Sequence, residues 1–413
     1  MRLAYLLKKF PSLSESFVTT EILEQEALGA EVHIFSRQAR DDEPRHPELD
    51  HLEATVEVFP RLGELHPWGM ALAAGSEGPR TFERSRLRSI VHERSPMIGE
   101  RFPLLIAEAL HFRRRALELS IEHVHVHSDL ESAVVAMLAN ELGGPSYSLT
   151  AHAVDIDHDE VGPDLLESLI LGSTFLVAVC DAMVVDLRAR ISPEAATRIR
   201  RLYNGLSLER FPYREIGRNP EHILSAGQLV EERGFGALVA AFAELKRQGR
   251  PFMATLVGSG EDKQKLKALA KDMGLNAETI MFTGAIGPIA LRALMRDATM
   301  FCLPCAVSSD GKRDALPTVL LEALAMGLPC ISTPVLGIPE ILDHGRAGRL
   351  VPDRDPAALV ETISELMDDP AQRLNIARRG RRRAEQLFDA RRSGEALHGW
   401  FQSVLPVSAE WSG

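Results

Sequence analysis

Hydrophobic positions in the first part of the chain alternate between strand-like runs and helix-like spacing. Residues 2–7 form a short apolar run typical of a buried strand, and residues 17–28 repeat apolar side chains at helical spacing before Gly29. Residues 31–35 predict a further strand. Strand, helix and strand in a stretch this short form a βαβ unit, and the pattern therefore predicts a parallel sheet.

The alternation continues and then restarts after a linker. Strands are also predicted at 124–127, 146–150 and 175–179, with a helix at 130–142. Residues 204–220 are rich in Gly, Pro, Asn and Arg and mark a domain boundary. A second series of strands follows, at 222–226, 253–257, 280–283, 300–303 and 329–332. We predict an α/β protein with two Rossmann-like parallel-sheet domains, residues 1–205 and 206–390, whose strand ends face a common cleft.

Composition and charge narrow the class of protein. The chain has 413 residues and a formal net charge of −11, which argues against a nucleic-acid partner because phosphate binding needs clustered cations. The first nine residues have too short an apolar stretch for a signal peptide, and no apolar run reaches spanning length. We therefore expect a cytoplasmic protein.

Four cysteines stand at positions 180, 302, 305 and 330. Cys302 and Cys305 have the C-x-x-C spacing of thiol oxidoreductases, but they close the apolar run 300–303, which reads as a buried strand. Free cysteine is common in cores, so we interpret the pair as structural.

The segment after strand 300–303 carries the clearest chemical signal. A polar loop, 308–313, leads to Pro317, which we expect to be the first residue of a helix because its missing N–H costs nothing there. The free N–H groups beyond it would form an anion site suited to a diphosphate. Asp314 precedes the helix, where it can meet a sugar hydroxyl, and Glu322 lies in the second turn, within reach of ribose hydroxyls.

These residues resemble glycosyltransferase family 4. The family's mark is two acidic residues separated by seven others, here Asp314 and Glu322, followed by Gly327-Leu328-Pro329 and Gly337-Ile338-Pro339-Glu340. Similar family features are Tyr203-Asn204-Gly205, the turn at Gly258 and the Phe282-Thr283-Gly284 turn. The start, residues 9–17, is similar to the branch that builds bacterial exopolysaccharides of the colanic-acid type.

The resemblance implies a GT-B fold in which a C-terminal helix, at about 391–413, crosses back to the first domain. It implies a retaining, metal-independent hexosyltransferase without a cofactor, acting in cell-surface or exopolysaccharide biosynthesis. The second domain would bind a nucleotide sugar, a UDP- or GDP-sugar, and the first would bind a saccharide or lipid-linked acceptor. Leu397, Trp400, Phe401 and Leu405 are at helical spacing, in agreement with the expected last helix.

The resemblance also assigns roles to individual positions. Asp314 and His152 would lie at the reacting centre. His152 ends a strand and could instead be a core or capping histidine, but strand ends face the cleft in this architecture, which favours a functional role. The donor would be bound by Gln228, Arg233, Gly258, Gly284, Leu316, Pro317, Thr318, Val319 and Glu322. The acceptor side would include Ser14, Glu15, Ser16 and His127.

Some positions depart from the family pattern. Gln228 stands where the family has an arginine of its diphosphate clamp, so Arg233 is left as the clamp's cation, and Asp314 replaces the usual glutamate. These departures keep two alternatives open: a sugar-nucleotide epimerase of the same fold, and a sugar-nucleotide-binding protein without catalytic activity.

Two polar clusters permit more than one interpretation. His123, His125 and His127 alternate along one strand and share a face. With His152 and the acidic stretch 155–159 they could form a zinc site, but hydrogen-bonded buried histidines fit equally, and we expect no metal. Residues 80–118 carry nine arginines against five glutamates. This stretch could contact an anionic inner membrane face peripherally, or could be a solvated helix face.

Overall fold

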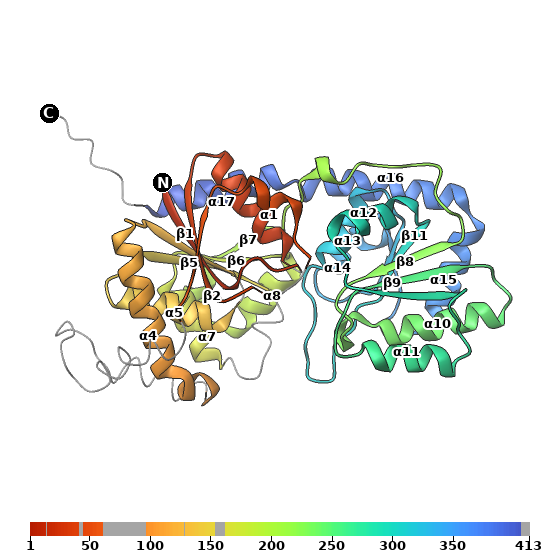
Figure 1. Ribbon diagram of the computed structural model, residues 1–413, viewed down its shortest axis with the longest axis horizontal. Coiled ribbons are helices and arrows are strands. Elements are labelled where there is room, and N and C mark those ends of the chain that lie inside the picture. The colour runs from red at the N-terminus through yellow and green to blue at the C-terminus, as the bar shows by residue number, and fades with distance from the viewer. Residues whose placement is uncertain (14, 41–43, 61–95, 128, 153–161, 406–413) are drawn as a thin grey trace.

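The computed structural model consists of two α/β units placed end to end, with one parallel sheet in each (Figure 1). It describes residues 1–413 except 14, 41–43, 61–95, 128, 153–161 and 406–413, and of residues 96–100 only the backbone. The strand order is β3-β2-β1-β4-β5-β6-β7 in the first sheet and β10-β9-β8-β11-β12-β13 in the second. The predicted pair of parallel sheets is confirmed, and both sheets are built outward from their first strand in the same way.

The strands of the first sheet are β1 (Arg2–Lys9), β2 (Glu31–Gln38), β3 (Thr55–Val58), β4 (His123–His127), β5 (Ser146–Ala151), β6 (Leu176–Ala178) and β7 (Ile199–Arg201). Those of the second are β8 (His222–Ala226), β9 (Met253–Val257), β10 (Ile280–Gly284), β11 (Met300–Leu303), β12 (Cys330–Ser332) and β13 (Arg349–Leu350). β3, β7 and β13 were not expected from the sequence. All three are edge strands of two to four residues, too short to show a hydrophobic period.

Helices cover both sheets. In the first unit they are α1 (Ser16–Ala27), α4 (Pro96–Glu118), α5 (Leu130–Glu141), α7 (Pro163–Gly172), α8 (Asp181–Arg190) and α9 (Pro193–Ala196), with the 3-10 turn η1 (Pro47–His51). The linker contains η2 (Leu208–Arg210). In the second unit they are η3 (Glu231–Arg233), α10 (Phe235–Arg247), α11 (Lys263–Asp272), α12 (Pro288–Asp297), α13 (Thr318–Ala325), α14 (Ile338–Ile341), η4 (Asp343–Gly345), α15 (Pro356–Asp368) and α16 (Pro370–Leu387). The chain ends with α17 (Ala390–Val404).

The last helix leaves the second unit and packs on the first, as predicted (Figure 1). Leu397 and Phe401 are fully buried in a cluster with side chains of β1, β2 and α1. Gln25 of α1 donates from Nε2 to the Gly394 carbonyl at 3.0 Å and contacts His398 Nδ1 at 3.0 Å through Oε1. Trp400 lies edge-on to Phe175. The tail helix therefore belongs to the core of the first unit.

The two places where the chain crosses between units are bonded to each other. The Leu206 N–H donates to the Phe388 carbonyl at 2.7 Å, and the Ala390 N–H donates to the Leu206 carbonyl at 2.9 Å. A Cβ at Gly205 would lie 2.5 Å from the Ala390 Cα, so this close approach requires glycine. Both crossings form one narrow junction.

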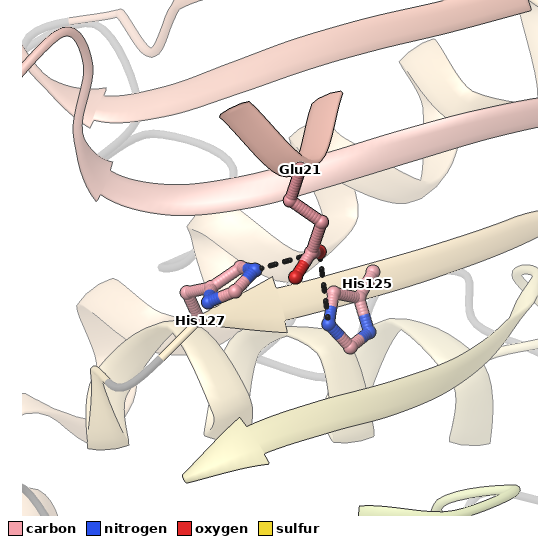
Figure 2. Close-up of side chains that lie close together, drawn as sticks. All are labelled: Glu21, His125 and His127. Atoms are coloured by element: carbon pink, nitrogen blue, oxygen red, sulfur yellow. Dashed lines mark hydrogen bonds and ion pairs between the residues drawn. The ribbon is translucent and has the colours of Figure 1, made fainter. Parts of the chain in front are cut away.

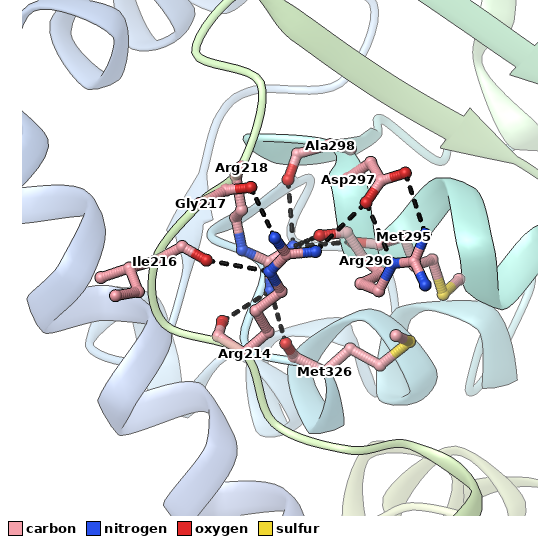
Figure 3. A network of polar contacts seen from close by, with 9 residues as sticks. All are labelled: Arg214, Ile216, Gly217, Arg218, Met295, Arg296, Asp297, Ala298 and Met326. Atoms are coloured by element: carbon pink, nitrogen blue, oxygen red, sulfur yellow. Dashed lines mark hydrogen bonds and ion pairs between the residues drawn. The ribbon is translucent and has the colours of Figure 1, made fainter.

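Beyond that junction, two arginines anchor the linker to the second unit (Figure 3). The Arg218 guanidinium donates to the carbonyls at the ends of α12 and α13, including those of Met295 at 2.7 Å and Met326 at 2.6 Å. Arg214 donates to the Gly217 carbonyl at 2.7 Å and pairs with Asp297 at 3.2 Å. A guanidinium suits helix C-termini because their last carbonyls have no helical partner. The linker from Arg214 onward is therefore part of the second unit.

A second contact between the units involves Glu340 of α14. Its carboxylate accepts from the backbone N–H groups of Asp181 and Ala182, at 2.8 and 2.7 Å, and from the Tyr203 hydroxyl at 2.9 Å. Asp181 begins α8 of the first unit, so a carboxylate from one unit caps a helix of the other. This contact joins the two units at a second place, apart from the junction at Leu206.

Candidate functional site

A cleft of about 400 Å³ lies between the two units at the C-terminal ends of their strands. The first unit contributes Leu13, Ser16, Thr20, His46 and Glu48 to its wall, and the linker contributes Gly205 to Ser207, Arg210 and Phe211. The second unit contributes two glycine-rich turns, part of α12 and the start of α13. A ligand in this cleft would touch both units.

Backbone close to the surface forms much of the wall in the second unit. Gly227 follows β8, and Gly258 and Gly260 follow β9. Gly258 has φ +141°, and a Cβ there would lie 1.8 Å from the Gly227 carbonyl oxygen. Gly258 and Gly260, where a Cβ would lie within 2.4 Å of backbone atoms, therefore have no room for a side chain, and a ligand can approach their backbone closely.

The helix predicted after Asp314 is present, but it begins one residue later than expected. Pro317 is the residue before the first helical turn, and Thr318 is the first helical residue, because Pro317 has extended backbone angles, φ −60° and ψ 107°. Thr318 and Val319 line the cleft. Leu316 and Pro317 are outside the cleft lining. The positive end of α13 thus faces the space between the units.

Two residues predicted to contact the donor are bonded to each other. Arg233 donates through Nη1 to Asp314, and both side chains are largely buried, with exposed fractions of 19% and 15%. Burial disfavours the charged Arg233, but Asp314, Cys305 and Glu232 together outweigh burial and raise the pKa of the guanidinium. Asp314 also accepts from the Leu316 N–H at 3.1 Å, and so links Arg233 to the turn before α13. Arg233 and Gln228 line the cleft, whereas Asp314 lies behind Arg233.

Glu322 lines the cleft one turn into α13. Burial raises the pKa of its carboxyl to about 7, against a smaller opposing effect of Arg292. A carboxyl group with this pKa changes charge near neutral pH, which matters for any ligand that needs it ionised.

Gly284, also predicted at the donor site, ends β10. Its carbonyl accepts from the Gly258 N–H at 2.9 Å, so it supports the glycine turn from outside the cleft lining.

The sequence analysis did not identify three charged residues that line the cleft, Glu48, Arg210 and Arg292. Glu48 of the first unit lies 3.6 Å from Arg210 of the linker and 3.5 Å from Arg292 of α12. One Glu48 oxygen, Oε2, is buried and has no hydrogen-bond partner among the described residues. Nothing near Glu48 in the sequence marks it, because it meets the two arginines only through the arrangement of the two units.

The polar edge of the first unit is built from side chains on α1, β1 and β4. Glu21 accepts from the Tyr5 hydroxyl at 2.9 Å and lies 3.0 Å from His127 Nε2 and 3.6 Å from His125 Nε2 (Figure 2). His127 ends β4, and its side chain is 3% exposed. Glu21 was not expected at the site, since α1 shows only a helical period in the sequence.

A row of hydrogen bonds runs along β4 and β5 behind this edge. His123 contacts the Ser146 and Ser148 hydroxyls, and His125 contacts those of Ser148 and Thr150, all at 2.8–2.9 Å. Burial lowers the pKa of His123 to about 3 and that of His125 well below its ordinary value, so both rings are neutral. The shared face predicted for these histidines is therefore a hydrogen-bonded ladder.

His152 and the other acceptor-side residues lie around this edge. His152 follows β5, its ring is 4.8 Å from Phe17 and 5.9 Å from His127, and burial lowers its pKa to about 3. Burial raises the pKa of Glu15, which is close enough to His127 to interact electrostatically. Ser16 lines the cleft. Ser14 and the acidic stretch 155–159 lie outside the described residues.

One group among the described residues has the composition of a metal site. The ligand atoms of Glu21, His125 and His127 all lie within 4.8 Å of one another. Both ring nitrogens of His125, however, already have hydroxyl partners, and Glu21 already accepts from Tyr5. Hydrogen bonds therefore account for these contacts without an ion.

The cysteine pair is structural. Cys302 and Cys305 are fully buried, and burial raises the pKa of both thiols, that of Cys305 to about 12. A thiol oxidoreductase needs an accessible thiolate, so the geometry excludes that interpretation.

The basic stretch is described only from residue 96 onward, and Arg80 to Arg94 lie outside the described residues. Arg101 pairs with Glu131, Arg114 with Glu118 and Arg115 with Glu57. Arg113 donates to the Leu142 carbonyl at 2.7 Å. These arginines contact groups of the protein itself. No helix in the described parts of the chain has the length and apolar character needed to traverse a lipid bilayer.

Comparisons with known proteins agree with this architecture. The family described as "Glycosyl transferases group 1" matches residues 210–383, which make up most of the second unit. A Salmonella typhimurium protein named for colanic acid biosynthesis, WcaL, is 25% identical over 98% of this chain and 100% of its own length. The amylovoran biosynthesis glycosyltransferase AmsK of Erwinia amylovora is 24% identical over 94% of this chain and 96% of its own.

Solved structures show the same fold. A sucrose-phosphate synthase from Thermosynechococcus elongatus superposes with a TM-score of 0.74 at 18% identity, covering 98% of this chain and 99% of that protein. The Anabaena protein HepE, solved in complex with UDP, superposes with a TM-score of 0.68 at 16% identity, covering 98% and 100%. The fold predicted from the family resemblance is confirmed, and these relatives support neither the epimerase nor the binding-protein alternative.

Proposed function

We propose that the chain is a glycosyltransferase with the GT-B fold, similar to those of group 1, and that it transfers a sugar from a UDP- or GDP-sugar to a saccharide or lipid-linked saccharide. The acceptor would be a precursor of a bacterial exopolysaccharide or another cell-surface glycan, since the relatives similar over the whole chain are named for such pathways. HepE was solved with UDP, and this supports a nucleotide donor here.

One observation carries the donor site. The start of α13, Arg233 and the glycine turns after β8 and β9 meet on one wall of the cleft, with Glu322 beside them. A helix N-terminus and a guanidinium are groups that bind a diphosphate, and the glycine turns let a diphosphate lie close to the backbone. An ionised Glu322 can accept hydrogen bonds from the two ribose hydroxyls, so the nucleotide would lie along this wall.

The transfer would retain the configuration of the sugar. With the diphosphate on the wall of the second unit, the acceptor hydroxyl would enter from the first unit, on the face from which the phosphate leaves. A leaving phosphate oxygen would take the hydroxyl proton as the new glycosidic bond forms and the sugar–phosphate bond breaks. Arg233 and the N–H groups at Thr318 and Val319 would stabilise the charge that develops on the diphosphate.

The experiment is a panel of UDP- and GDP-sugars tested by thermal shift, followed by incubation of the best donor with lipid-linked and free saccharides. We expect one donor to stabilise the protein and to be consumed with an acceptor, with the α or β configuration of the product linkage, read by NMR, equal to that of the donor. Consumption of the donor without acceptor, to give an isomer of the sugar nucleotide, would contradict the proposal.

Metal independence and membrane contact are separate parts of the proposal. Transfer should persist in EDTA, because cationic and backbone groups can bind the diphosphate; loss in EDTA that one divalent ion restores would contradict this. The basic stretch 80–118 would bring a cytoplasmic enzyme to the anionic inner membrane face. Flotation should then be greater with anionic than with neutral vesicles at low salt, and equal flotation would remove the membrane role.

A further inference from the structure

The Glu48 carboxylate lies in the wall of the cleft beside two arginines. Its side chain is 9% exposed and lines the cleft. Oε1 lies 3.6 Å from Arg210 Nε and 3.5 Å from Arg292 Nη1, and Oε2 has no hydrogen-bond partner among the described residues. Charge-assisted hydrogen bonds are about 2.7–2.9 Å long, and buried polar atoms are nearly always bonded. A carboxylate in a cleft wall that could accept further hydrogen bonds indicates a ligand that supplies a donor.

Two contacts place Glu48 beside the start of α12. Glu48 belongs to η1, apart from the histidines along β4. Just before η1, His46 Nε2 lies 3.0 Å from the Leu13 carbonyl, which can only accept, so the ring donates this hydrogen bond. Pro44 lies against the turn between β10 and α12, where a Cβ on Gly287 would be 3.8 Å from the Pro44 Cβ. The fold thus brings a carboxylate of the first unit to the second, and rotation about its last torsion can present either oxygen to the cleft.

The groups around Glu48 indicate which part of a nucleotide it would meet. Burial is the main cause of the raised pKa of Glu322, and smaller effects of Arg292 and Glu48 show that both lie near its carboxyl. Under the proposed function Glu322 binds the ribose, so the base, which the ribose carries, comes next along the cleft. The cleft also has an apolar surface for the flat face of a base, lined by Val257, Ile286, Pro288 and Leu291. Glu48 and Arg292 would then meet the polar edge of the base.

The order of donors and acceptors at this edge matches some bases and not others. A carboxylate next to a guanidinium presents an acceptor beside donors. Uracil and guanine complement this order, because each has a ring N–H directly beside a carbonyl. Cytosine and adenine have the reverse order, a ring nitrogen lone pair beside an amino group. With those bases the carboxylate would face a lone pair and the guanidinium would face an amino group, and neither contact is a hydrogen bond.

We propose that Glu48 and Arg292 read the base of the donor, with the carboxylate accepting from the ring N–H and the guanidinium donating to the adjacent carbonyl. The pair selects uracil or guanine against cytosine and adenine. The inference rests on the proposed function, and it adds a residue of the first unit to the donor site, so a bound nucleotide touches both units. It concerns binding alone, and no covalent bond forms or breaks.

A purely electrostatic role is the competing interpretation, in which Glu48 only neutralises Arg210 and Arg292 where the units meet. That role leaves the buried Oε2 without a partner among the described residues. Removal of the charge would then weaken the binding of every nucleotide alike, whereas base reading predicts an effect that depends on the base. The ratio of affinities for different bases therefore separates the two interpretations.

The first test compares UDP, GDP, CDP and ADP by calorimetric titration. In the wild type, UDP or GDP should bind about tenfold or more tightly than CDP and ADP, the difference expected from one charge-assisted hydrogen bond, and the tighter of the two identifies the base. Glu48→Gln can turn its amide N–H toward a ring lone pair, so it should lower this preference about tenfold, toward equal binding. A preference that Glu48→Gln leaves intact, or an equal loss for all four nucleotides, overturns the proposal.

The matched control is Asp186→Asn. Asp186 of α8 pairs with Arg313 of the second unit at 3.3 Å, and both residues are outside the cleft lining. The substitution removes one negative charge from another contact between the units, and it should leave the base preference unchanged. A change of preference as large as that in Glu48→Gln would contradict the proposal, since it would come from how the units fit together.

The second test removes the donor from the ligand. UDP methylated at N3 and GDP methylated at N1 lack the ring N–H. Methylation of the preferred nucleotide should cost the wild type about tenfold or more in affinity and should cost Glu48→Ala much less, because that substitution removes the partner and makes room for the methyl group. Equal losses in the two proteins overturn the proposal. Failure of the proposed function has a different signature, because then none of the nucleotides would bind the wild type, and the inference would fall with it.

Discussion

The two sheets of this protein have the same strand order around their first strand, yet their cleft-facing edges are built from different chemistry. In the second unit the edge consists of glycine turns and a helix start, so backbone groups face the cleft. In the first unit it consists of imidazole, carboxylate and hydroxyl side chains that bond to one another. Backbone groups are fixed by the fold, and under the proposed function they would face the diphosphate that UDP- and GDP-sugars share. Side chains can be exchanged, and they suit an acceptor that differs between enzymes.

The cleft-facing edge of the second unit, which is built from backbone groups, should tolerate substitutions least. Gly258→Ala would place a methyl group 1.8 Å from the Gly227 carbonyl oxygen at φ +141°. We expect a loss of about 3 kcal/mol or more in unfolding free energy, together with loss of nucleotide binding. Urea unfolding and titration with UDP and GDP measure the two.

The matched control is Gly236→Ala in α10, where a Cβ would meet nothing within 4 Å. It should leave nucleotide binding unchanged and raise stability by up to about 1 kcal/mol, because alanine favours a helix over glycine. Equal effects of the two substitutions would show that the tight glycine turn is not what the donor site needs.

Substitutions in the cleft-facing edge of the first unit along β4 and β5, which is built from side chains, should change the stability of the protein but not its donor binding. Ser148→Ala leaves one nitrogen of His123 and one of His125 buried without a partner. We expect a loss of about 2–3 kcal/mol, since an unpaired buried polar group costs about 1–3 kcal/mol. Ser146→Ala, at the partly exposed end of the ladder, should cost less. A drop in nucleotide affinity in Ser148→Ala would contradict the separation of the two edges.

Donor binding at the cleft wall of the second unit should depend on the Arg233 side chain. Arg233→Ala should weaken donor binding by about 1.5–3 kcal/mol, roughly 10- to 150-fold, the range for a hydrogen bond to a charged group. Gln228→Arg should tighten binding of UDP or GDP. Arg233 also neutralises Asp314, so the double variant Arg233→Ala with Asp314→Asn is the control. Donor binding that returns to normal in the double variant would show that Arg233 only compensates Asp314.

Glu322 should give the smallest effect, and one that depends on pH. Its pKa of about 7 leaves the carboxyl mostly protonated at pH 6 and mostly ionised at pH 8. Because the proposed hydrogen bonds to ribose need the ionised form, affinity for the sugar nucleotide should fall about tenfold from pH 8 to pH 6. Calorimetric titration measures this, and Glu322→Gln should remove the pH dependence.

The contribution of Glu322 to folding stability should increase as pH falls, whereas affinity for the sugar nucleotide should decrease. The folded-state pKa of Glu322 lies above its ordinary value of 4.5, so the folded protein binds this proton more tightly than the unfolded chain. The contribution of Glu322 to stability therefore increases as pH falls from above 7 toward 4.5. A difference between wild type and Glu322→Gln that does not vary with pH would show that burial does not shift the group.

The sequence predicted the central strands, the linker and the last helix because each has its own local signal. Residues 222–226 and 253–257 are apolar runs of strand length, and the spacing of Leu397 and Phe401 marks a helix with one buried face. The edge strands β3 and β13 are too short for a period to show. Their position comes from pairing with a neighbour, which the sequence does not display.

The candidate site was predicted in part, for a related reason. Thr318, Glu322 and Arg233 stand in segments whose spacing resembles a known family, so their place on the cleft could be anticipated. Glu48 and Arg292 meet only across the two units, and Glu21 meets His127 only once α1 packs over β4. Such pairs depend on tertiary packing, for which one sequence has no signal. The pairing of Arg233 with Asp314 was missed for the same reason.

The joined crossings at Leu206 and Asp389 define where this protein could be cut and recombined with a relative. An exchange of the whole segment between these positions would cut the chain at both sides of a single small contact and would keep the Arg218 anchor inside the transplanted piece. The incoming piece would have to supply the carboxylate that Glu340 offers to α8. Under the proposed function, chimaeras joined at this seam would pair a new donor specificity with the original acceptor specificity, and the helix that ends the chain would remain with the part it packs on.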